Sequence, residues 1–182
     1  MTWKRLDSRV VFDNDWFTVK EDRVVSPTGS EHDYGHIHFK NTAVAIVPID
    51  DADNTWLVGQ DRYTLGEYSW EVPMGGSHPG EDPAETAMRE LREETGLTAG
   101  RLELVMKVHT SNSITDEVGL VYVAEELESG APQFDEMEDL QMRKLPLSDA
   151  VEMVMRGEIT DAISVAALLR IAAQKSIRAD TT

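Results

Sequence analysis

Residues 75–97 decide the fold, and they read Gly-Gly-Ser-His-Pro-Gly-Glu-Asp-Pro-Ala-Glu-Thr-Ala-Met-Arg-Glu-Leu-Arg-Glu-Glu-Thr-Gly-Leu. A glycine-rich turn runs into a segment that carries helix signals at both ends. Asp82 is a preferred N-cap, Pro83 suits the first helical position, and Glu85 stands where it would complete a reciprocal capping box. Gly96 supplies the left-handed conformation that commonly stops a helix. The segment therefore predicts a helix that begins at Asp82 and ends at Gly96.

Three acids on this helix, Glu90, Glu93 and Glu94, lie beside its apolar stripe. Glu90 and Glu94 stand one turn apart, where like charges repel by about 0.2–0.5 kcal/mol in water. A divalent cation reverses that sign, because hard ions such as Mg²⁺ prefer carboxylate oxygens. Arg89 can pair along the helix and hold the acids in place. The acids alone also fit a solvated acidic face, so the metal interpretation depends on the wider pattern.

The chain on both sides of the helix alternates short apolar runs with turn residues. Residues 42–49 are almost continuously apolar and predict a strand buried on both faces. Helices are expected from Ser148 to about Met155, and from Thr160 or Asp161 to about Lys175. Strands are also expected at residues 9–12, 16–20, 34–39, 55–60, 102–109, 117–125 and 140–145.

The spacing in the first segment matches the signature of the Nudix hydrolases at every fixed position. It reads Gly75, five residues, Glu81, seven residues, then Arg-Glu-Leu-x-Glu-Glu-x-Gly-Leu from residue 89 to residue 97. Chance would produce such a match on the order of once per billion start points. The chain also resembles the ADP-ribose and nucleoside-diphosphate-sugar pyrophosphatase branch of this superfamily at residues 9–19, 58–63, 70–75 and 159–168.

This resemblance implies an α/β fold of mixed α+β type, a Nudix αβα sandwich with a mixed β-sheet. It implies an N-terminal antiparallel β unit at residues 1–40, which in relatives helps to pair two subunits, so a homodimer is expected. The Nudix domain would follow at residues 41–178, with its signature box at 75–97. Residues 179–182 are expected to fray.

The resemblance also implies roles for the residues of the box and its entry. Glu90 and Glu94 align with carboxylate metal ligands, and Glu93 with a third acid of the cluster. Met74 aligns with the position that offers its backbone carbonyl to a metal. Three further positions, Gly75, Glu81 and Gly96, are expected to be structural, while Arg89 joins the catalytic group.

Outside the box, the resemblance implies substrate contacts and a general base. Arg62 and Glu71 align with substrate-binding positions. An acidic loop that includes Glu136 and Glu138 resembles the branch's loop that supplies the base. Glu138 stands at the expected base position with Glu136 beside it as a substrate contact, and Glu93 is the rival base. A solvated acidic run is the alternative for this loop.

One departure from the family pattern bears on the substrate. Many ADP-ribose enzymes of this branch carry Ser-Pro-Gly-like residues after the box, where this chain has Asn112 in place of the proline and Ser113 in place of the glycine. Polar side chains here could reach sugar hydroxyls, and buried hydrogen-bond partners discriminate strongly between substrates. Asn112 is therefore a candidate substrate contact, and the choice among ADP-ribose, GDP-mannose and UDP-glucose stays open.

Composition narrows the class of protein further. The 182 residues suit one domain, or one domain with a small added unit. A net charge of −17 disfavours nucleic-acid polymers and anionic membrane surfaces as partners. With no cysteine, disulfide and thiol chemistry are excluded. No signal core or apolar run of about 18 residues is present, so a cytoplasmic location is expected.

Together these observations predict a Mg²⁺-dependent hydrolase, with Mn²⁺ as a substitute, that cleaves the diphosphate linkage of a nucleoside diphosphate sugar. The products would be a nucleoside monophosphate and a sugar phosphate. One alternative is a Nudix-like sensor that binds a nucleotide sugar without cleaving it. Another is a housecleaning hydrolase of damaged nucleoside triphosphates, which shares the box and the metals.

Overall fold

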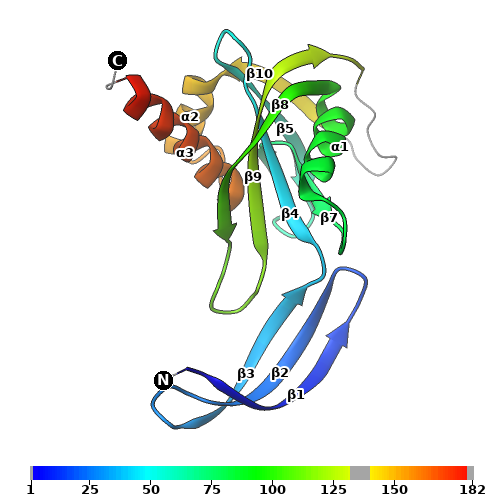
Figure 1. Ribbon diagram of the computed structural model, residues 1–182, viewed down its shortest axis with the longest axis vertical. Helices are drawn as coiled ribbons and strands as arrows, with labels where there is room; N and C mark the ends of the chain where they lie inside the picture. Colours follow the sequence, from blue (N-terminus) through cyan, green and yellow to red (C-terminus); the bar gives the residue numbers. More distant parts are fainter. Residues whose placement is uncertain (1, 132–139, 180–182) are drawn as a thin grey trace.

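The computed structural model describes residues 2–131 and 140–179, and the backbone alone at residues 178 and 179. Two units are visible in Figure 1: a body of strands and helices, and a three-stranded sheet that extends from it at the N-terminal end. The N-terminal sheet is antiparallel, with the order β1-β2-β3. The elements are β1 (Lys4–Asp13), β2 (Phe17–Val25), β3 (Glu31–Phe39), β4 (Thr42–Pro48), β5 (Asn54–Arg62), β6 (Glu67–Glu71), β7 (Met74–Ser77), α1 (Pro83–Thr95), β8 (Leu97–His109), β9 (Val118–Ser129), β10 (Gln141–Pro146), α2 (Leu147–Met155) and α3 (Ala162–Ala179).

The body contains two sheets between helices. One has the order β7-β4-β9-β8 and is mixed, because β4 and β9 are parallel while the other pairs are antiparallel. The other is antiparallel, with the order β10-β5-β6. Helix α1 covers one side of the sheets, and α2 and α3 cover the other (Figure 1). The expected mixed α+β sandwich with an antiparallel N-terminal sheet is confirmed.

Strand β4 is the centre of the body, as its apolar run predicts. Val44 and Ile46 pack with Ala87 and Leu91 of α1, whereas Val47 packs into the cluster formed with α2 and α3. Each of these side chains is fully buried. Burial of a Val, Leu or Ile side chain contributes about 1.5–3 kcal/mol to the stability of the fold. The buried side chains of β4 therefore stabilise the packing of both helical layers on the sheet.

Helix α1 has the predicted bounds, with one error at its start. The Asp82 carboxylate accepts a hydrogen bond from the Ala84 N–H at 2.9 Å, and Gly96 has a φ of 71° at the end of the helix. The prediction of a reciprocal capping box was wrong, because among the described residues the Glu85 carboxylate accepts no hydrogen bond from the Asp82 N–H. Glu81 closes the turn instead, since its Oε2 accepts from the His78 N–H at 3.0 Å.

The strand predictions missed two short elements and several boundaries. Strand β1 begins at Lys4 rather than residue 9, β2 continues to Val25 rather than residue 20, and β9 continues to Ser129 rather than residue 125. Strands β6 and β7 were not expected, and β8 begins at Leu97, directly after α1, rather than at residue 102. Helices α2 and α3 are confirmed, although α3 continues past Lys175 to Ala179. The rest of the expected fraying tail, residues 180–182, lies outside the described residues. In the part of the chain that the structure describes, no helix is both long and apolar enough to cross a membrane.

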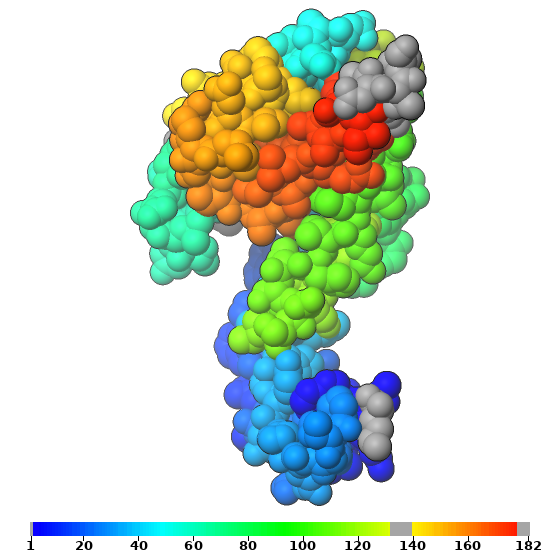
Figure 2. Space-filling view, turned by 90° about the vertical axis from the view of Figure 1, so that its left-hand side faces the viewer, coloured from blue at the N-terminus to red at the C-terminus, as the bar shows by residue number. Residues whose placement is uncertain are grey.

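A short contact region joins the N-terminal sheet to the body. The tip of the β8–β9 hairpin lies beside β3, where Ile37 forms a parallel bridge with Thr115. The Ile37 N–H donates to the Ile114 carbonyl at 2.9 Å, and the Asp116 N–H donates to the Ile37 carbonyl at 3.2 Å. In Figure 2 the N-terminal sheet stands out below the body, with the hairpin reaching it. We call residues 110–117 the hairpin tip.

Candidate active site

The acids of α1 face the short strand β7, and a glycine makes their approach possible. A Cβ atom at Gly75 would stand 1.9 Å from Glu90 Oε1 and 2.0 Å from Glu90 Cδ. The Glu90 carboxylate therefore lies directly against the backbone of β7. One turn later along α1, Glu94 Oε2 accepts a hydrogen bond from the Met74 N–H at 3.0 Å, and Glu94 is only 4% exposed. Two carboxylates are thus held on one wall beside Met74 and Gly75.

Arg89 balances this wall of negative charge. Its guanidinium nitrogens lie 2.7 Å from Glu90 Oε1, 2.9 Å from Glu93 Oε2 and 3.7 Å from Glu81 Oε1. Burial alone would lower the pKa of Arg89, but the charges of Glu90 and Glu93 outweigh it and raise that pKa. Charge-assisted bonds of this kind fix the geometry of a carboxylate as well as its charge. Arg89 therefore orders the acids of the box.

A second charged pair lies next to this wall. Arg62 Nε donates to Glu71 Oε1 at 2.8 Å, and Arg62 Nη2 donates to the other oxygen of the same carboxylate. Glu71 is 3% exposed, while the Arg62 side chain is 36% exposed. The hydrogen bonds that Arg62 donates to Glu71 are the main cause that raises the pKa of Arg62, and the charges of Glu71, Asp161 and Glu94 add to it.

Arg62 opens into a pocket of about 440 Å³. Only two of its five N–H donors are used by Glu71, so the remainder of the fork is available to a ligand in the pocket. The pocket is lined by Arg62, Thr64, Leu65, Glu71, Thr160, Asp161 and Ala162. A planar guanidinium beside an open pocket is suited to bind phosphate or carboxylate oxygens.

The start of α3 supports the connection between β6 and β7, which lies between the two charged groups. Ser164 Oγ accepts a hydrogen bond from the Val72 N–H at 3.0 Å, and Ser164 is fully buried. The Ser164 N–H in turn donates to Asp161 Oδ2 at 2.7 Å. The sequence offered Thr160 or Asp161 as the N-cap, and Asp161 accepts the bond. Ser164 was missed, because its partner Val72 is 92 residues away and leaves no local signal.

The donor set of the α1 wall fits a hard divalent cation. Mg²⁺ in proteins commonly takes one or two carboxylates and completes its shell with waters and substrate phosphates. Glu90 and Glu94 supply two carboxylates beside β7, where the Met74 N–H donates to Glu94. Within residues 2–131 and 140–179, no three His, Asp or Glu side chains converge on one point. Two protein carboxylates suit an ion that completes its shell with waters and substrate oxygens.

The structure separates the predicted site residues into three groups. Those of the box and its entry, together with Arg62 and Glu71, come together as described above. Asn112 does not join them, since it lies at the hairpin tip in a different pocket, against the N-terminal sheet. Glu136 and Glu138 lie outside the described residues.

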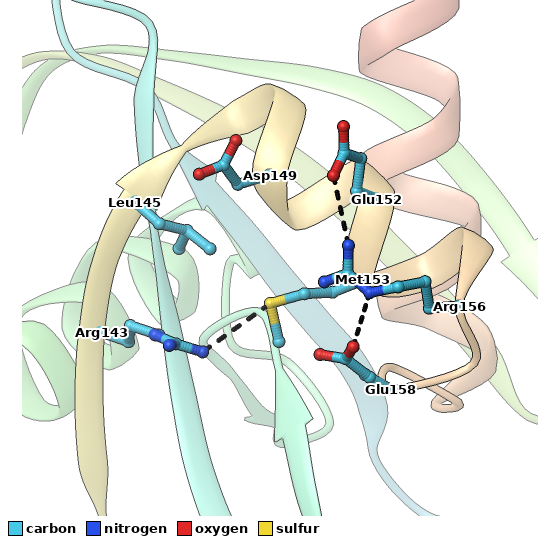
Figure 3. A pocket seen from close by; sticks show the side chains of 7 residues that line it. All are labelled: Arg143, Leu145, Asp149, Glu152, Met153, Arg156 and Glu158. Atoms are coloured by element: carbon cyan, nitrogen blue, oxygen red, sulfur yellow. Dashed lines mark hydrogen bonds and ion pairs between the residues drawn. The ribbon is translucent and has the colours of Figure 1, made fainter.

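Another pocket, of about 360 Å³, lies between β10 and α2 (Figure 3). Most of its charges satisfy one another: Arg156 binds both Glu152 and Glu158, and Arg143 points toward the Met153 sulfur. None of the predicted site residues lines this pocket. This pocket is therefore separate from the carboxylates of the α1 wall.

Comparison with known proteins identifies the family of the chain. Residues 39–167 match the NUDIX domain, and residues 3–37 match the nucleoside diphosphate sugar hydrolase N-terminal domain. The chain thus belongs to the Nudix family, with the fold of that family, and is a Nudix pyrophosphatase. Within that family it falls in the ADP-ribose and nucleoside-diphosphate-sugar pyrophosphatase branch.

Individual relatives support this placement. An ADP-ribose pyrophosphatase of Mycobacterium tuberculosis is 38% identical over 85% of this chain and 76% of its own length. An ADP-ribose pyrophosphatase of Bacillus subtilis is 34% identical over 75% of each chain. The crystal structure of an ADP compounds hydrolase superposes with a TM-score of 0.87 at 26% identity, over 98% of this chain and 96% of the other. The similarity to that structure includes the N-terminal sheet.

Proposed function

We propose that this protein hydrolyses the diphosphate linkage of a nucleoside diphosphate sugar in a Mg²⁺-dependent reaction, and that it releases a nucleoside monophosphate and a sugar phosphate. The observation that carries the proposal is the α1 wall, where Glu90 lies against Gly75 and Glu94 binds the Met74 N–H. Two fixed carboxylates next to an arginine pocket match the needs of a polyanionic substrate. ADP-ribose is the first substrate to test, since the relatives named above carry it in their names.

In this proposal Glu90 and Glu94, with the Met74 carbonyl, hold the metal, and Mn²⁺ can replace Mg²⁺. A Mg²⁺ ion held there would polarise the diphosphate oxygens as a Lewis acid and would lower the pKa of bound water. Arg89 keeps the acids in their positions through its contacts with Glu90 and Glu93.

Arg62 binds the substrate's phosphate oxygens with the part of its fork that Glu71 leaves open. Glu71 fixes the plane of the guanidinium, so that the remaining N–H donors point into the pocket rather than sampling many rotamers. Glu71 thus acts on the substrate through Arg62. The carboxylate is nearly inaccessible itself.

We propose Glu138 as the general base, with Glu93 as the rival. Glu93 Oε2 already accepts a hydrogen bond from Arg89 at 2.9 Å, so it would have to give up that bond to take a proton from water. Glu138→Gln and Glu93→Gln separate the two. Loss of the acidic limb of the pH–rate profile in one variant only identifies the base.

A homodimer formed through the N-terminal sheet completes the proposal. All ten residues of β1 are exposed, and several apolar side chains of this unit face solvent. They are Trp3, Leu6, Val10, Val11, Phe12 and Trp16. An apolar surface of this kind usually marks an interface. Light scattering after gel filtration should give twice the chain mass, and Val11→Glu should shift it toward the monomer.

The decisive experiment measures phosphate release from ADP-ribose, GDP-mannose, UDP-glucose and nucleoside triphosphates, coupled to a phosphatase, with and without Mg²⁺. Mg²⁺-dependent cleavage of one diphosphate sugar that disappears in Glu94→Gln is the expected result. Binding without turnover would show that the protein is a nucleotide-sugar sensor rather than an enzyme. Cleavage of nucleoside triphosphates alone would show that the proposed substrate class is wrong. Asn112→Pro tests whether the hairpin tip sets the preference among sugars, through a change in relative rates.

A further inference from the structure

The chain passes from one sheet of the body to the other between β6 and β7, and this passage joins the two charged groups of the site. Strand β6 ends at Glu71 in the β10-β5-β6 sheet, and β7 begins at Met74 in the β7-β4-β9-β8 sheet. Glu71 holds the Arg62 guanidinium, whereas the Met74 N–H binds a carboxylate of the α1 wall. Only Val72 and Pro73 lie between them. We call these two residues the sheet crossing.

Each half of the site is held on its own side of the sheet crossing. On one side, Glu71 pairs with Val58 of β5, the strand that ends at Arg62. On the other side, Met74 pairs with Ala45 of β4. These pairings fix each half to its own sheet, but they do not by themselves fix the distance between the halves. That distance also depends on the backbone of the sheet crossing.

The backbone of the sheet crossing is bonded to two different elements. Pro73 has no N–H, so Val72 supplies the only backbone N–H of the crossing. The Pro73 carbonyl accepts a hydrogen bond from the Ile46 N–H at 2.8 Å, which ties one end of the crossing to β4. The Val72 N–H donates to Ser164 Oγ at 3.0 Å, which ties the other end to α3. Ser164 thus completes the attachment of the crossing.

Ser164 is the exception on the buried face of α3. The buried residues in the described part of this helix are Ile163, Ser164, Ala167, Leu168 and Ile171, and Ser164 alone among them is polar. A buried hydroxyl without a partner costs free energy, and alanine would favour the helix more. The Ser164 N–H donates to Asp161 Oδ2 at 2.7 Å, so the residue is itself held at the start of the helix. Its bond to the sheet crossing accounts for a hydroxyl at this position.

We infer that Ser164 is a positioning residue of the hydrolase site, which sets the place of the Arg62–Glu71 pair relative to the carboxylates of the α1 wall. Ser164 does not line the pocket beside Arg62, so it acts through Val72. The inference rests on the hydrolase activity proposed above. Hydrolysis needs the diphosphate at the arginine and at the metal simultaneously, whereas binding to either half alone does not need their alignment. A misplacement of about 1 Å in such an alignment can cost about a hundredfold in rate.

The test compares Ser164→Ala with the parent enzyme in two measurements. Steady-state kinetics on the best diphosphate sugar at saturating Mg²⁺ give kcat and KM. A titration with Mn²⁺ in the absence of substrate gives the Kd of the metal. We expect kcat to fall about tenfold or more, while KM and the Mn²⁺ Kd each stay within about threefold of the parent values. A residue that only stabilises the fold would leave the kcat of the folded enzyme unchanged.

Matched variants make the result specific. Ser164→Cys keeps a side chain of similar size but replaces the hydroxyl by a weak acceptor, so it should behave like Ser164→Ala. Ile171→Val removes a buried methylene two turns further along the same helix. It should destabilise the protein without touching the sheet crossing and should keep the parental kcat. All variants are assayed at a temperature where their unfolding curves show them to be folded.

Three results would overturn the inference. One is a parental kcat in Ser164→Ala. Another is an equal fall of kcat in Ile171→Val, which would mean that any loosening of α3 lowers the rate. The third is a loss of Mn²⁺ affinity as large as the loss of kcat, which would mean that Ser164 supports the α1 wall itself. A parent enzyme without Mg²⁺-dependent turnover would contradict the proposed function and this inference together, so the two failures are distinguishable.

Discussion

Replacement of Gly75 by alanine tests the α1 wall directly. Because β7 and α1 are in contact here, the new Cβ would stand 1.9 Å from Glu90 Oε1, whereas ordinary contact begins at 3.4 Å. The difference, 3.4 − 1.9, requires the carboxylate to move by about 1.5 Å. The clashing atoms belong to the Glu90 carboxylate, the flexible end of its side chain, so they can move without unfolding the protein. A displacement of 1 Å or more at a reacting centre can cost about a hundredfold in rate.

The expected phenotype of Gly75→Ala is therefore a loss of activity without a loss of stability. Removal of a glycine lowers the entropy of the unfolded chain and should offset small strains by about 0.5–1 kcal/mol. Gly76→Ala is the matched control, since its Cβ would meet only Asn41, at 3.3 Å. Neither glycine has a positive φ, so the two substitutions differ mainly in what the methyl group meets.

The assay measures kcat on the best diphosphate sugar at saturating Mg²⁺, together with the melting temperature. We expect kcat to fall about a hundredfold in Gly75→Ala and to stay within about threefold of the parent in Gly76→Ala. A Gly75→Ala variant with parental kcat would refute the role of Glu90. A similar loss in both variants would show that β7 tolerates no methyl group, whatever Glu90 does.

Three further predictions concern the surroundings of the site. Arg62→Lys keeps the charge but loses the fork, so kcat/KM should fall about tenfold in steady-state assays; an unchanged KM would contradict the phosphate contact. Ser164→Ala leaves the buried Val72 N–H without an acceptor and should lower the unfolding free energy by about 1–3 kcal/mol in urea titrations; parental stability would contradict this. Burial raises the pKa of Asp50, but the hydrogen bonds it accepts, chiefly from Lys144, outweigh burial and lower it. Its contribution to stability is therefore complete above about pH 4 and is lost as the pH falls further, so Asp50→Asn should flatten the acid limb of the stability curve; an unchanged limb would count against it.

Local signals explain which parts of the fold could be predicted from sequence. Helix α1 was predictable because its cap, Asp82, and its stop, Gly96, act within one turn of the chain. The doubly buried strand β4 was predictable because its apolar run has no polar face to expose. Strand β7 was not, since Met-Gly-Gly-Ser has little strand propensity and forms a strand only by pairing with β4.

The candidate site shows the same division. The box acids could be identified from their spacing on one helix, and Arg89 could be identified because it stands in the same signature. Ser164 could not be found, because its value lies in one long-range hydrogen bond. The predicted substrate contact of Asn112 stays a prediction. Hydrogen bonds between the hairpin tip and β3 hold the Asn112 loop against the N-terminal sheet, away from the box acids. Such pairing depends on the folded body and is invisible to a reading of neighbouring residues.

The contact between β3 and the hairpin tip has a consequence for the order of folding. Strands β1 to β3 are joined by tight turns and pair with near neighbours in sequence, which favours early formation. The bonds of Tyr34 and Phe39 to the hairpin tip span 79 and 77 residues, so they form only after β8 and β9 are in place. The amides of Ile37 and Phe39 belong to the N-terminal sheet by sequence, yet their protection from hydrogen exchange reports on the integrity of the body.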